Sequence, residues 1–244
     1  MDPDSRAARA ASFGGVADVY EQARPEYPDE AVAWLAGSTP RDVVDLGAGT
    51  GKLTRRLVAA GHRVVAVEPA GEMLEQLRRV VPDVRALVGT AEAIPVPDGS
   101  ADVVVAGQAF HWFDHGPALR EIARVLRPGG TLGLVWNARD ESAPWVRRLT
   151  EIIGAERASA GELTAVIDAS GLFGPVEEAT FGFEQRLDRD ALLALVSSRS
   201  YCATRPADER GAILDQVGRV FDEEADEDTI VLPYLTDAFR ARRL

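Results

Sequence analysis

The chain has 244 residues, of which 46% are hydrophobic and 27% charged, and its formal net charge is −12 at pH 7. This length is enough for one large domain with its own core. The acidic balance argues against nonspecific nucleic-acid binding, which needs a face rich in lysine and arginine. No run of about 18 apolar residues occurs, so the sequence predicts no transmembrane helix.

The cysteine content and the N-terminus indicate the compartment. Cys202 is the single cysteine, so no internal disulfide can form, which fits a reducing environment. The first residues, MDPDSRAARAASFGG, place acids before the arginines and lack an apolar segment, so they do not resemble a secretory signal. We therefore expect a cytoplasmic protein.

Two helices are predicted ahead of residue 41. They cover GVADVYEQAR (15–24) and PDEAVAWLAGS (28–38), and the proline-rich RPEYP (24–28) joins them. We expect this pair to form a helical lid within residues 1–40.

Residues 41–137 alternate between short apolar runs and segments with helical spacing. The apolar runs are typical of buried parallel strands and comprise RDVVDLG (41–47), HRVVAVEP (62–69), VRALVGT (84–90), ADVVVAGQ (101–108) and TLGLVWN (131–137). The amphipathic segments between them are KLTRRLVAAG (52–61), GEMLEQLRRVV (71–81) and PALREIARVLRPGG (117–130). The alternation predicts right-handed crossovers and an α/β, Rossmann-like, doubly wound sheet with helices on both faces.

Three connections in this core carry signals of their own. Pro128-Gly129-Gly130 predicts a firm helix stop before the fifth strand. AEAIPVPDGS (91–100) is too short for a full crossover helix, so we expect a compressed turn there. His62, at a helix-to-strand turn, is expected at the surface.

Residues 138–244 are expected to hold the C-terminal helices and the late strands. The helical segments are APWVRRLTEIIGAER (143–157), RDALLALVSSRSY (189–201) and ERGAILDQVGRVFDEEA (209–225), and the extended ones are VEEATFGFEQRLD (176–188) and DTIVLPYLTDAFRARR (228–243). The acid-rich run DEEADED (222–228) is most simply a solvated helix end or loop, with a metal or partner site as the alternative. No linker divides the chain, so we expect one domain over 1–244.

The stretch VVDLGAGTGKLT (43–54) is a glycine-rich loop that does not fit a triphosphate site. A P-loop needs a glycine, four residues, and then Gly-Lys-Ser/Thr. Here Leu53 follows Gly51-Lys52, and Leu46 stands where the first glycine belongs. The dinucleotide fingerprint also fails, because Lys52 replaces the last glycine, which lets the helix pack closely on the strand.

Two acids favour a cationic or zwitterionic nucleoside instead. Asp45, at the carboxyl end of the first strand, would repel a pyrophosphate but suits an ammonium or sulfonium group. Glu68 ends the second strand, 17 positions after Gly51, where an acid can accept both ribose hydroxyls. Alone, Glu68 is equally typical of a solvated strand end; together with the loop it indicates a nucleoside site.

These motifs resemble those of class I S-adenosylmethionine-dependent methyltransferases. VVDLGAGTGKLT with VVAVEPAGEML is similar to the first two motifs, GTAEAIPVPDGSADVVVAGQAFHWFD to the third and fourth, and VLRPGGTLGLVW to the strand-five motif. The similarity covers roughly residues 40–137. VYEQARPEYPDE and AFHWFD resemble the small-molecule subgroup that includes trans-aconitate methyltransferase-like proteins. The resemblance implies a seven-stranded sheet, mostly parallel with one antiparallel strand.

The resemblance also implies the cofactor, S-adenosylmethionine, and the residues that bind it. Asp45 would hold the methionine amino group and Glu68 the ribose hydroxyls, while Met73 would flank the adenine, although core filling is the bland alternative for Met73. The remaining implied cofactor residues are Gly47, Ala48, Gly49 and Gly51 of the loop, Pro69 beside the adenine, Ala91 and Glu92 at the adenine edge, and Gln108 near the methionine portion.

GQAFHWFDH (107–115) follows the fourth strand, at the edge where open α/β sheets place their ligands. Phe110, Trp112 and Phe113 are candidates for an apolar wall that excludes water from the sulfonium. His111 is the candidate general base, with a purely structural role as the alternative, because methyl transfer often needs little beyond orientation. His111 and His115 lack a third nearby ligand, so we expect no metal site.

The lid and the residues after the fifth strand complete the predicted acceptor side. Tyr20 is placed at the methyl group as a second catalytic candidate, and Arg24 near the cofactor carboxylate or an anionic substrate; a packed helix pair is the structural alternative. Trp136, Arg139 and Tyr201 are predicted to shape the substrate pocket, although each alone is more typical of a structural role.

The leading hypothesis is therefore transfer of a methyl group from S-adenosylmethionine to an oxygen, nitrogen or carbon of a small molecule by in-line displacement. A non-catalytic module that binds the same cofactor is one alternative, because Asp45, Glu68 and the glycine loop would serve it equally well. An NAD(P)-dependent oxidoreductase is the other, and Lys52 together with Asp45 speaks against it.

Overall fold

The structure is a computed structural model that describes residues 24–154, 160–197, 202 and 205–244. These residues divide into two compact units. The larger unit consists of Glu26–Asn137, the described part of Ala158–Phe181, and Thr236–Leu244. The smaller unit consists, within the described chain, of Arg24, Pro25 and the described parts of Ala138–Arg157 and Gly182–Leu235. No described helix is long and apolar enough to cross a membrane.

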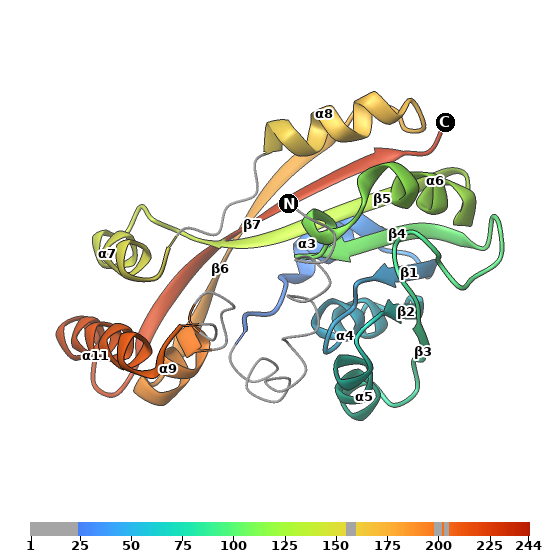
Figure 1. The fold of residues 1–244 in the computed structure, drawn as a ribbon. Coiled ribbons are helices and arrows are strands. Elements are labelled where there is room, and N and C mark those ends of the chain that lie inside the picture. Colours follow the sequence, from blue (N-terminus) through green and yellow to red (C-terminus); the bar gives the residue numbers. More distant parts are fainter. Residues whose placement is uncertain (1–23, 155–159, 198–201, 203–204) are drawn as a thin grey trace. The chain divides into compact units, whose positions relative to one another are not determined.

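Seven strands form one mixed sheet (Figure 1). In chain order they are β1 (Asp42–Leu46), β2 (Arg63–Glu68), β3 (Arg85–Val88), β4 (Ala101–Gly107), β5 (Leu126–Arg139), β6 (Glu177–Leu187) and β7 (Ile230–Arg242). Their order in the sheet is β3-β2-β1-β4-β5-β7-β6, and β3, β2, β1, β4 and β5 pair in parallel. The carboxyl ends of β1, β2 and β4 therefore meet at one edge of the sheet.

β7 runs opposite to β5, its neighbour. The backbone N–H of Arg243 donates to the carbonyl of Gly130, and that of Asp140 donates to the carbonyl of Pro233. Residue numbers on the two strands thus change in opposite directions, which is the antiparallel arrangement. β5, β6 and β7 each contribute residues to both units.

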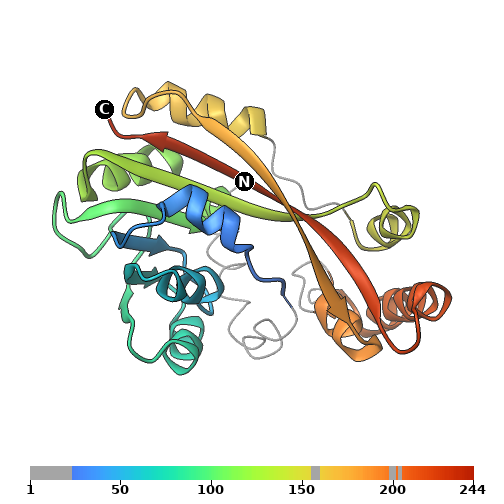
Figure 2. The ribbon, with the colours of Figure 1, turned by 180° about the vertical axis from the view of Figure 1, so that it is seen from behind.

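Helices cover both faces of the sheet in the larger unit. Val103 and Val105 of β4 pack with α3 (Asp29–Ala36) and α4 (Lys52–Ala59) on one face. The intervening Val104 faces the opposite core, which contains residues of α6 (His115–Val125) and α8 (Ala160–Ser170). Figure 1 shows α6 on the near face, and Figure 2, from behind, shows α3 on the other. Alternate residues of a strand point to opposite faces, so two apolar faces demand two helical layers. A further helix, α5 (Gly71–Val80), connects β2 to β3.

The smaller unit has a separate apolar core. Its described helices are α7 (Pro144–Ile153), α9 (Arg189–Ser197) and α11 (Ala207–Glu224), and α11 contacts both of the others. Apolar side chains of these helices pack with residues of β6 and β7, and Cys202 is buried among them.

Most of the predicted elements are confirmed. Strands occur within all five apolar runs of 41–137 and within both extended C-terminal segments, and no helix separates β3 from β4. Sequence reasoning missed α8, whose signal was the three-to-four spacing of Leu163, Val166 and Ile167. The prediction of one domain over 1–244 remains a prediction, as does the lid, because residues 1–23 lie outside the described chain.

Two local predictions were wrong. The helix before β5 ends at Val125, and β5 begins at once with Leu126 instead of after Gly130. Leu126 already pairs with Ala101 of β4, and a register shift before Val103 accommodates the Pro-Gly-Gly segment within the strand. His62 is buried at 5% exposure rather than lying at the surface, because its turn packs near Gly37 and Arg41.

Candidate functional site

The glycine loop, residues 47–51, connects the end of β1 to the start of α4. Gly47, Gly49 and Gly51 have φ values of +70°, +56° and +94°, which side chains with a Cβ adopt only at a cost. The N–H groups of Gly47 and Ala48 both donate to the carbonyl of Val67, at 2.8 and 3.1 Å. The loop is therefore fixed to β2 at its base.

The three glycines differ in what surrounds them. A Cβ at Gly47 would stand 2.7 Å from the Cβ of Ala109, and one at Gly51 would stand 2.9 Å from Cγ of Leu77. A Cβ at Gly49 would have no atom of the described residues within 4 Å. Gly47 and Gly51 are required by packing, whereas Gly49 faces open space that a ligand can approach.

Glu68 holds the tip of the loop. Its Oε2 accepts a hydrogen bond from the N–H of Gly49, and its Oε1 accepts one from the N–H of Ala70, both at 2.9 Å. Burial to 7% exposure raises the pKa of Glu68, and the two backbone hydrogen bonds oppose that rise. Each carboxylate oxygen keeps a further lone pair, so Glu68 can still accept ligand hydroxyls.

Asp45 is almost completely buried, at 1% exposure. Oγ1 of Thr54 donates to its Oδ2 at 2.5 Å, while Oδ1 is buried without a hydrogen-bond partner among the residues that the structure describes. Burial raises the pKa of Asp45 to about 7; the charge of Glu68 adds to the rise, and hydrogen bonds from Thr54 oppose it. A buried acceptor without a partner is costly, so this oxygen is suited to a ligand donor.

Asp45, Glu68 and Gly49 together fit the zwitterionic nucleoside that the sequence predicted. Two buried carboxylates raise each other's affinity for cations and disfavour phosphate. The unpartnered Oδ1 of Asp45 matches an ammonium donor, and the open side of Gly49 leaves room for the ligand. The residues present therefore fit S-adenosylmethionine.

Gln108 ends β4 in a strained conformation, with φ +57°. Its N–H donates to the carbonyl of Val135, and its side-chain amide donates to the carbonyl of Asn137 at 3.2 Å. The Asn137 side chain in turn donates to the carbonyl of Glu26 and accepts from the hydroxyl of Thr236, at 2.8 and 2.7 Å. Four separate stretches of the larger unit are thus joined beside the end of β4.

The turn that carries the predicted base, residues 110–115, is held from inside. Phe110 is fully buried, stacks on His115 with ring centroids 4.7 Å apart, and packs edge-on against Phe113. A ring nitrogen of His115 lies 3.2 Å from the carbonyl of Phe110. Oε1 of Glu92 accepts a hydrogen bond from the N–H of Asp114 at 2.8 Å.

His111 lies on the outside of this turn. Its side chain is exposed, and its ring centroid is 4.7 Å from that of the half-buried Trp112. Partial desolvation by the surrounding protein, and secondarily the charge of His115, lower the pKa of His111. The ring is therefore neutral at pH 7 and can accept a proton.

The other predicted adenine residues lie on neighbouring elements of the larger unit. Met73 of α5 and Ala91 are buried, Pro69 is exposed, and Glu92 is half-buried. In the larger unit the structure brings together the glycine loop, Glu68 and the start of the turn after β4. Glu68 accepts the N–H of Gly49, and Ala109 occupies the space where a side chain of residue 47 would lie.

Five predicted residues are not part of this arrangement as described. Trp136 is buried in the core of the larger unit, edge-on to Phe239. Arg24 and Arg139 belong to the smaller unit, where Arg139 donates to the hydroxyl of Thr150 and the carbonyl of Gly154. Tyr20 and Tyr201 lie outside the described residues. The roles given to these residues remain predictions.

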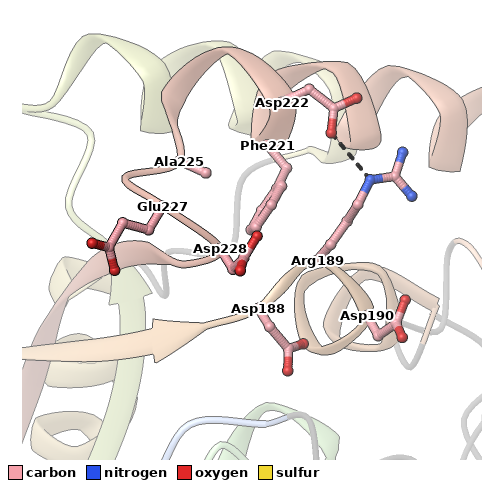
Figure 3. Close-up of a pocket in the computed structure, with 8 residues that line it drawn as sticks. All are labelled: Asp188, Arg189, Asp190, Phe221, Asp222, Ala225, Glu227 and Asp228. Carbon is pink, nitrogen blue, oxygen red and sulfur yellow. Dashed lines mark hydrogen bonds and ion pairs between the residues drawn. The ribbon is translucent and has the colours of Figure 1, made fainter.

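The smaller unit contains an acidic pocket of about 540 Å³ (Figure 3). It is lined by Asp188, Arg189, Asp190, Phe221, Asp222, Ala225, Glu227 and Asp228. Arg189 pairs with Asp222 at 3.1 Å. None of the residues predicted for the cofactor or the acceptor lines it. In the described part of the chain, no group of three or more His, Cys, Asp or Glu side chains is placed to hold a metal ion.

Sequence reasoning missed two polar residues in or beside the glycine loop. Thr54, on the first turn of α4, donates to Asp45, and the buried hydroxyl of Thr50 has no hydrogen-bond partner within the described chain. The available signal for Thr54 was a hydroxyl on the first turn of the helix that follows the loop. For Thr50, flanked by Gly49 and Gly51, the signal was its place inside the loop.

The chain is similar to known methyltransferases over the segment that contains this site. Residues 44–134 match the family model described as the methyltransferase domain. The chain is 47% identical over 240 residues to an uncharacterized methyltransferase of Mycobacterium tuberculosis strain H37Rv, covering 97% of this chain and 98% of the relative. It is 30% identical over 217 residues to the malonyl-acyl-carrier-protein O-methyltransferase of Pseudescherichia vulneris, covering 82% and 81%. A solved structure from Anaeromyxobacter dehalogenans, assigned to the type II methyltransferases, is similar with a TM-score of 0.65 and 27% identity, covering 90% and 97%.

Proposed function

The chain belongs to the S-adenosylmethionine-dependent methyltransferase family, and we propose that it methylates an oxygen, nitrogen or carbon of a small-molecule acceptor. The observation that carries the cofactor side of the proposal is the buried pair of carboxylates, Asp45 and Glu68, beside the open side of Gly49. This arrangement suits a ligand with a cationic amino-acid end and a ribose.

The proposal gives a role to each predicted cofactor residue of the larger unit. Asp45 accepts a hydrogen bond from the cofactor's amino group, Glu68 accepts from the ribose hydroxyls, and Gly49 allows close approach of the ligand to the backbone. Met73 and Pro69 flank the adenine. Ala91 and Glu92 meet its edge, and Gln108 contacts the methionine portion.

The acceptor side rests on the turn after β4. When bound, S-adenosylmethionine supplies an activated methyl group on a sulfonium. Trp112 shields that group from water, and the neutral His111 takes a proton from the acceptor. The displacement is in line, so orientation of the acceptor supplies most of the acceleration. Tyr20, Arg24, Trp136, Arg139 and Tyr201 stay candidates for the lid and the acceptor pocket, as does Phe110 if the turn opens.

The finer assignment within the family is also part of the proposal. VYEQARPEYPDE and AFHWFD support the small-molecule subgroup that includes trans-aconitate methyltransferase-like proteins. The net charge of −12 disfavours nucleic acid as the acceptor. The lone cysteine supports a cytoplasmic location.

Calorimetric titration with S-adenosylhomocysteine, NAD and NADP tests the cofactor site. We expect micromolar binding of S-adenosylhomocysteine and none of the dinucleotides. Binding of a dinucleotide alone would overturn the proposal and revive the oxidoreductase alternative.

Turnover separates the enzyme from a non-catalytic binding module. Purified protein is incubated with S-adenosylmethionine and a panel of phenols, amines and carboxylic acids, and release of S-adenosylhomocysteine is measured. Carboxylic acids are included because a relative is named a malonyl-acyl-carrier-protein O-methyltransferase. With an acceptor in hand, His111→Ala should reduce kcat while cofactor affinity is retained. Absence of turnover across the panel with tight cofactor binding would favour the binding module.

A further inference from the structure

The loop over residues 89–100 replaces the helix that normally links two parallel strands. It follows β3, carries Ala91 and Glu92, and enters β4 without forming a helix. Its own backbone hydrogen bonds are few: the N–H of Ala93 donates to Thr90 at 3.3 Å, and the N–H of Val96 donates to Ile94 at 2.8 Å. A loop with so little internal bonding needs outside support to keep one shape.

Arg124, on the last turn of α6, supplies much of that support. Its guanidinium donates to the carbonyls of Ile94 and Val96, at 2.9 and 3.0 Å, and to the carboxylate of Asp98 at 2.6 Å. Its backbone carbonyl accepts from the N–H of Gly99 at 3.0 Å. One residue thus binds the loop at four positions.

Glu121 sets the direction of the Arg124 side chain. Its carboxylate accepts two hydrogen bonds from the guanidinium, at 2.7 and 2.8 Å, and also one from the N–H of Ile94 at 2.9 Å. The pair is bidentate, which fixes geometry better than a single contact does. The loop therefore rests on a preformed platform on one helix.

The same loop reaches the turn on the acceptor side. Glu92 accepts the N–H of Asp114, the residue just before α6. The 89–100 loop is consequently bound at the start of α6 through Glu92 and at its end through Arg124.

We propose that Arg124 and Glu121 are positioning residues that set the enzyme's selectivity for adenine, by holding Ala91 and Glu92 at the adenine edge. The inference rests on the proposed function, because Ala91 and Glu92 are taken from it. A carboxylate accepts a hydrogen bond from the exocyclic amino group of adenine and repels the exocyclic carbonyl of hypoxanthine. A loop that is no longer held in place loses this discrimination.

The test compares binding of S-adenosylhomocysteine with binding of S-inosylhomocysteine, its hypoxanthine analogue, by calorimetry. The wild type should prefer the adenine compound by about tenfold or more, the size of one charge-assisted hydrogen bond. Arg124→Lys keeps the charge but cannot reach both carbonyls, so the preference should fall to about twofold. Glu121→Gln should change it in the same direction, and it carries the test if the lysine variant does not fold.

Arg120→Lys is the matched control, because Arg120 is exposed on the same helix; its preference should equal that of the wild type. A purely structural role for Arg124 would lower the melting temperature but leave the ratio of the two affinities unchanged, and that result overturns the inference. Equal binding of both compounds by the wild type overturns it as well. Failure of the wild type to bind either compound contradicts the proposed function itself, so the two failures are distinguishable.

Discussion

The carboxylate of Glu68 accepts a hydrogen bond from the backbone N–H of Gly49, 2.9 Å away, across the 19 positions that separate them in the chain. The residue proposed to bind the ribose therefore also fixes the tip of the glycine loop. If Glu68 binds the ribose as proposed, ligand binding and the order of the loop depend on the same side chain.

Glu68→Gln should mobilise the loop and weaken cofactor binding together. A glutamine can accept only through its carbonyl oxygen, so the N–H of Gly49 or of Ala70 loses its partner. We expect faster amide hydrogen exchange at Gly49 in the free protein and an affinity for S-adenosylhomocysteine reduced by about tenfold to 100-fold. Exchange is measured by NMR and affinity by calorimetry. Glu72→Gln, at an exposed position of α5, is the control, and unaltered Gly49 exchange in Glu68→Gln would contradict the dual role.

Alanine substitutions should separate the packing glycines from the ligand-facing one. Gly49→Ala places its Cβ in open space. Its free energy of unfolding should therefore fall only by the strain of a positive φ, about 1 kcal/mol. Gly47→Ala adds a clash with Ala109 to that strain, so its free energy of unfolding should fall by about 3 kcal/mol. Denaturant unfolding measures both. Gly49→Ala should nevertheless lose most of its cofactor affinity, because the methyl group occupies the side where the ligand approaches.

Gly61→Ala is the matched control for Gly49→Ala. Gly61 also has a positive φ, +87°, and lies in the turn between α4 and β2, where a Cβ would lie more than 4 Å from every atom in the part of the chain that the structure describes. Its alanine variant should lose the same stability and bind the cofactor as the wild type does. Equal affinity in the Gly49 and Gly61 variants would show that Gly49 does not face the ligand.

Cofactor affinity should increase as the pH rises toward 7 and above. Burial raises the pKa of Asp45 to about 7, so below that pH the free carboxyl is mostly protonated. The ammonium of the ligand favours the carboxylate, and binding must therefore release a proton in acid. We expect the affinity for S-adenosylhomocysteine to rise by up to about tenfold per pH unit between pH 5.5 and 7.

Asp45→Asn tests this origin of the pH dependence. The variant should bind more weakly at pH 7.5, and its affinity should vary less with pH, with the raised pKa of Glu68 supplying what remains. Calorimetry in two buffers of different ionisation enthalpy counts the protons released. Measurements stop at pH 7.5 because an α-amino group loses its own proton near pH 8. An affinity that is flat from pH 5.5 to 7.5 in the wild type would contradict the assignment.

The same carboxyl should make the ligand-free protein less stable at neutral pH. A carboxyl whose pKa rises from 3.8 in the unfolded chain to about 7 in the fold binds more protons when folded between those values. The stability that this carboxyl contributes to the fold is therefore fully present below pH 4, is lost as the pH rises through 7, and is absent above pH 7. At pH 8 Asp45→Asn should gain stability on the order of 4 kcal/mol. Thermal unfolding at pH 5 and 8 measures this gain, which should be smaller at pH 5.

The sequence was sufficient for the strands and for the position of the glycine loop because both depend on local signals. Valine-rich runs bounded by glycine and proline predict buried strands, and the spacing of Asp45, the glycines and Glu68 is read from consecutive positions. The predictions that were wrong concern features that depend on tertiary contacts. The start of β5 at Leu126 depends on a partner residue, Ala101, on another strand, and the burial of His62 depends on Arg41 and Gly37.

The acceptor side was less predictable for the same reason. Aromatic character alone did not reveal that Phe110 turns into the core and stacks on His115 while His111 faces out. The support of Gln108 by the carbonyl of Asn137, and the pairing of Asn137 with Thr236, join residues 29 and 99 positions apart. No local pattern encodes such contacts.

β7 lies between β5 and β6, and the hydrogen bond from Thr236 to Asn137 spans those 99 positions. At synthesis rates of roughly 5–20 residues per second, β5 leaves the ribosome about 5–20 s before its neighbour in the sheet is made. During that interval the nascent chain carries the finished glycine loop but an open edge on β5. The larger unit is thus among the last parts of the chain to close, and we expect the open edge of β5 to be able to pair with other chains for longer when elongation is slower.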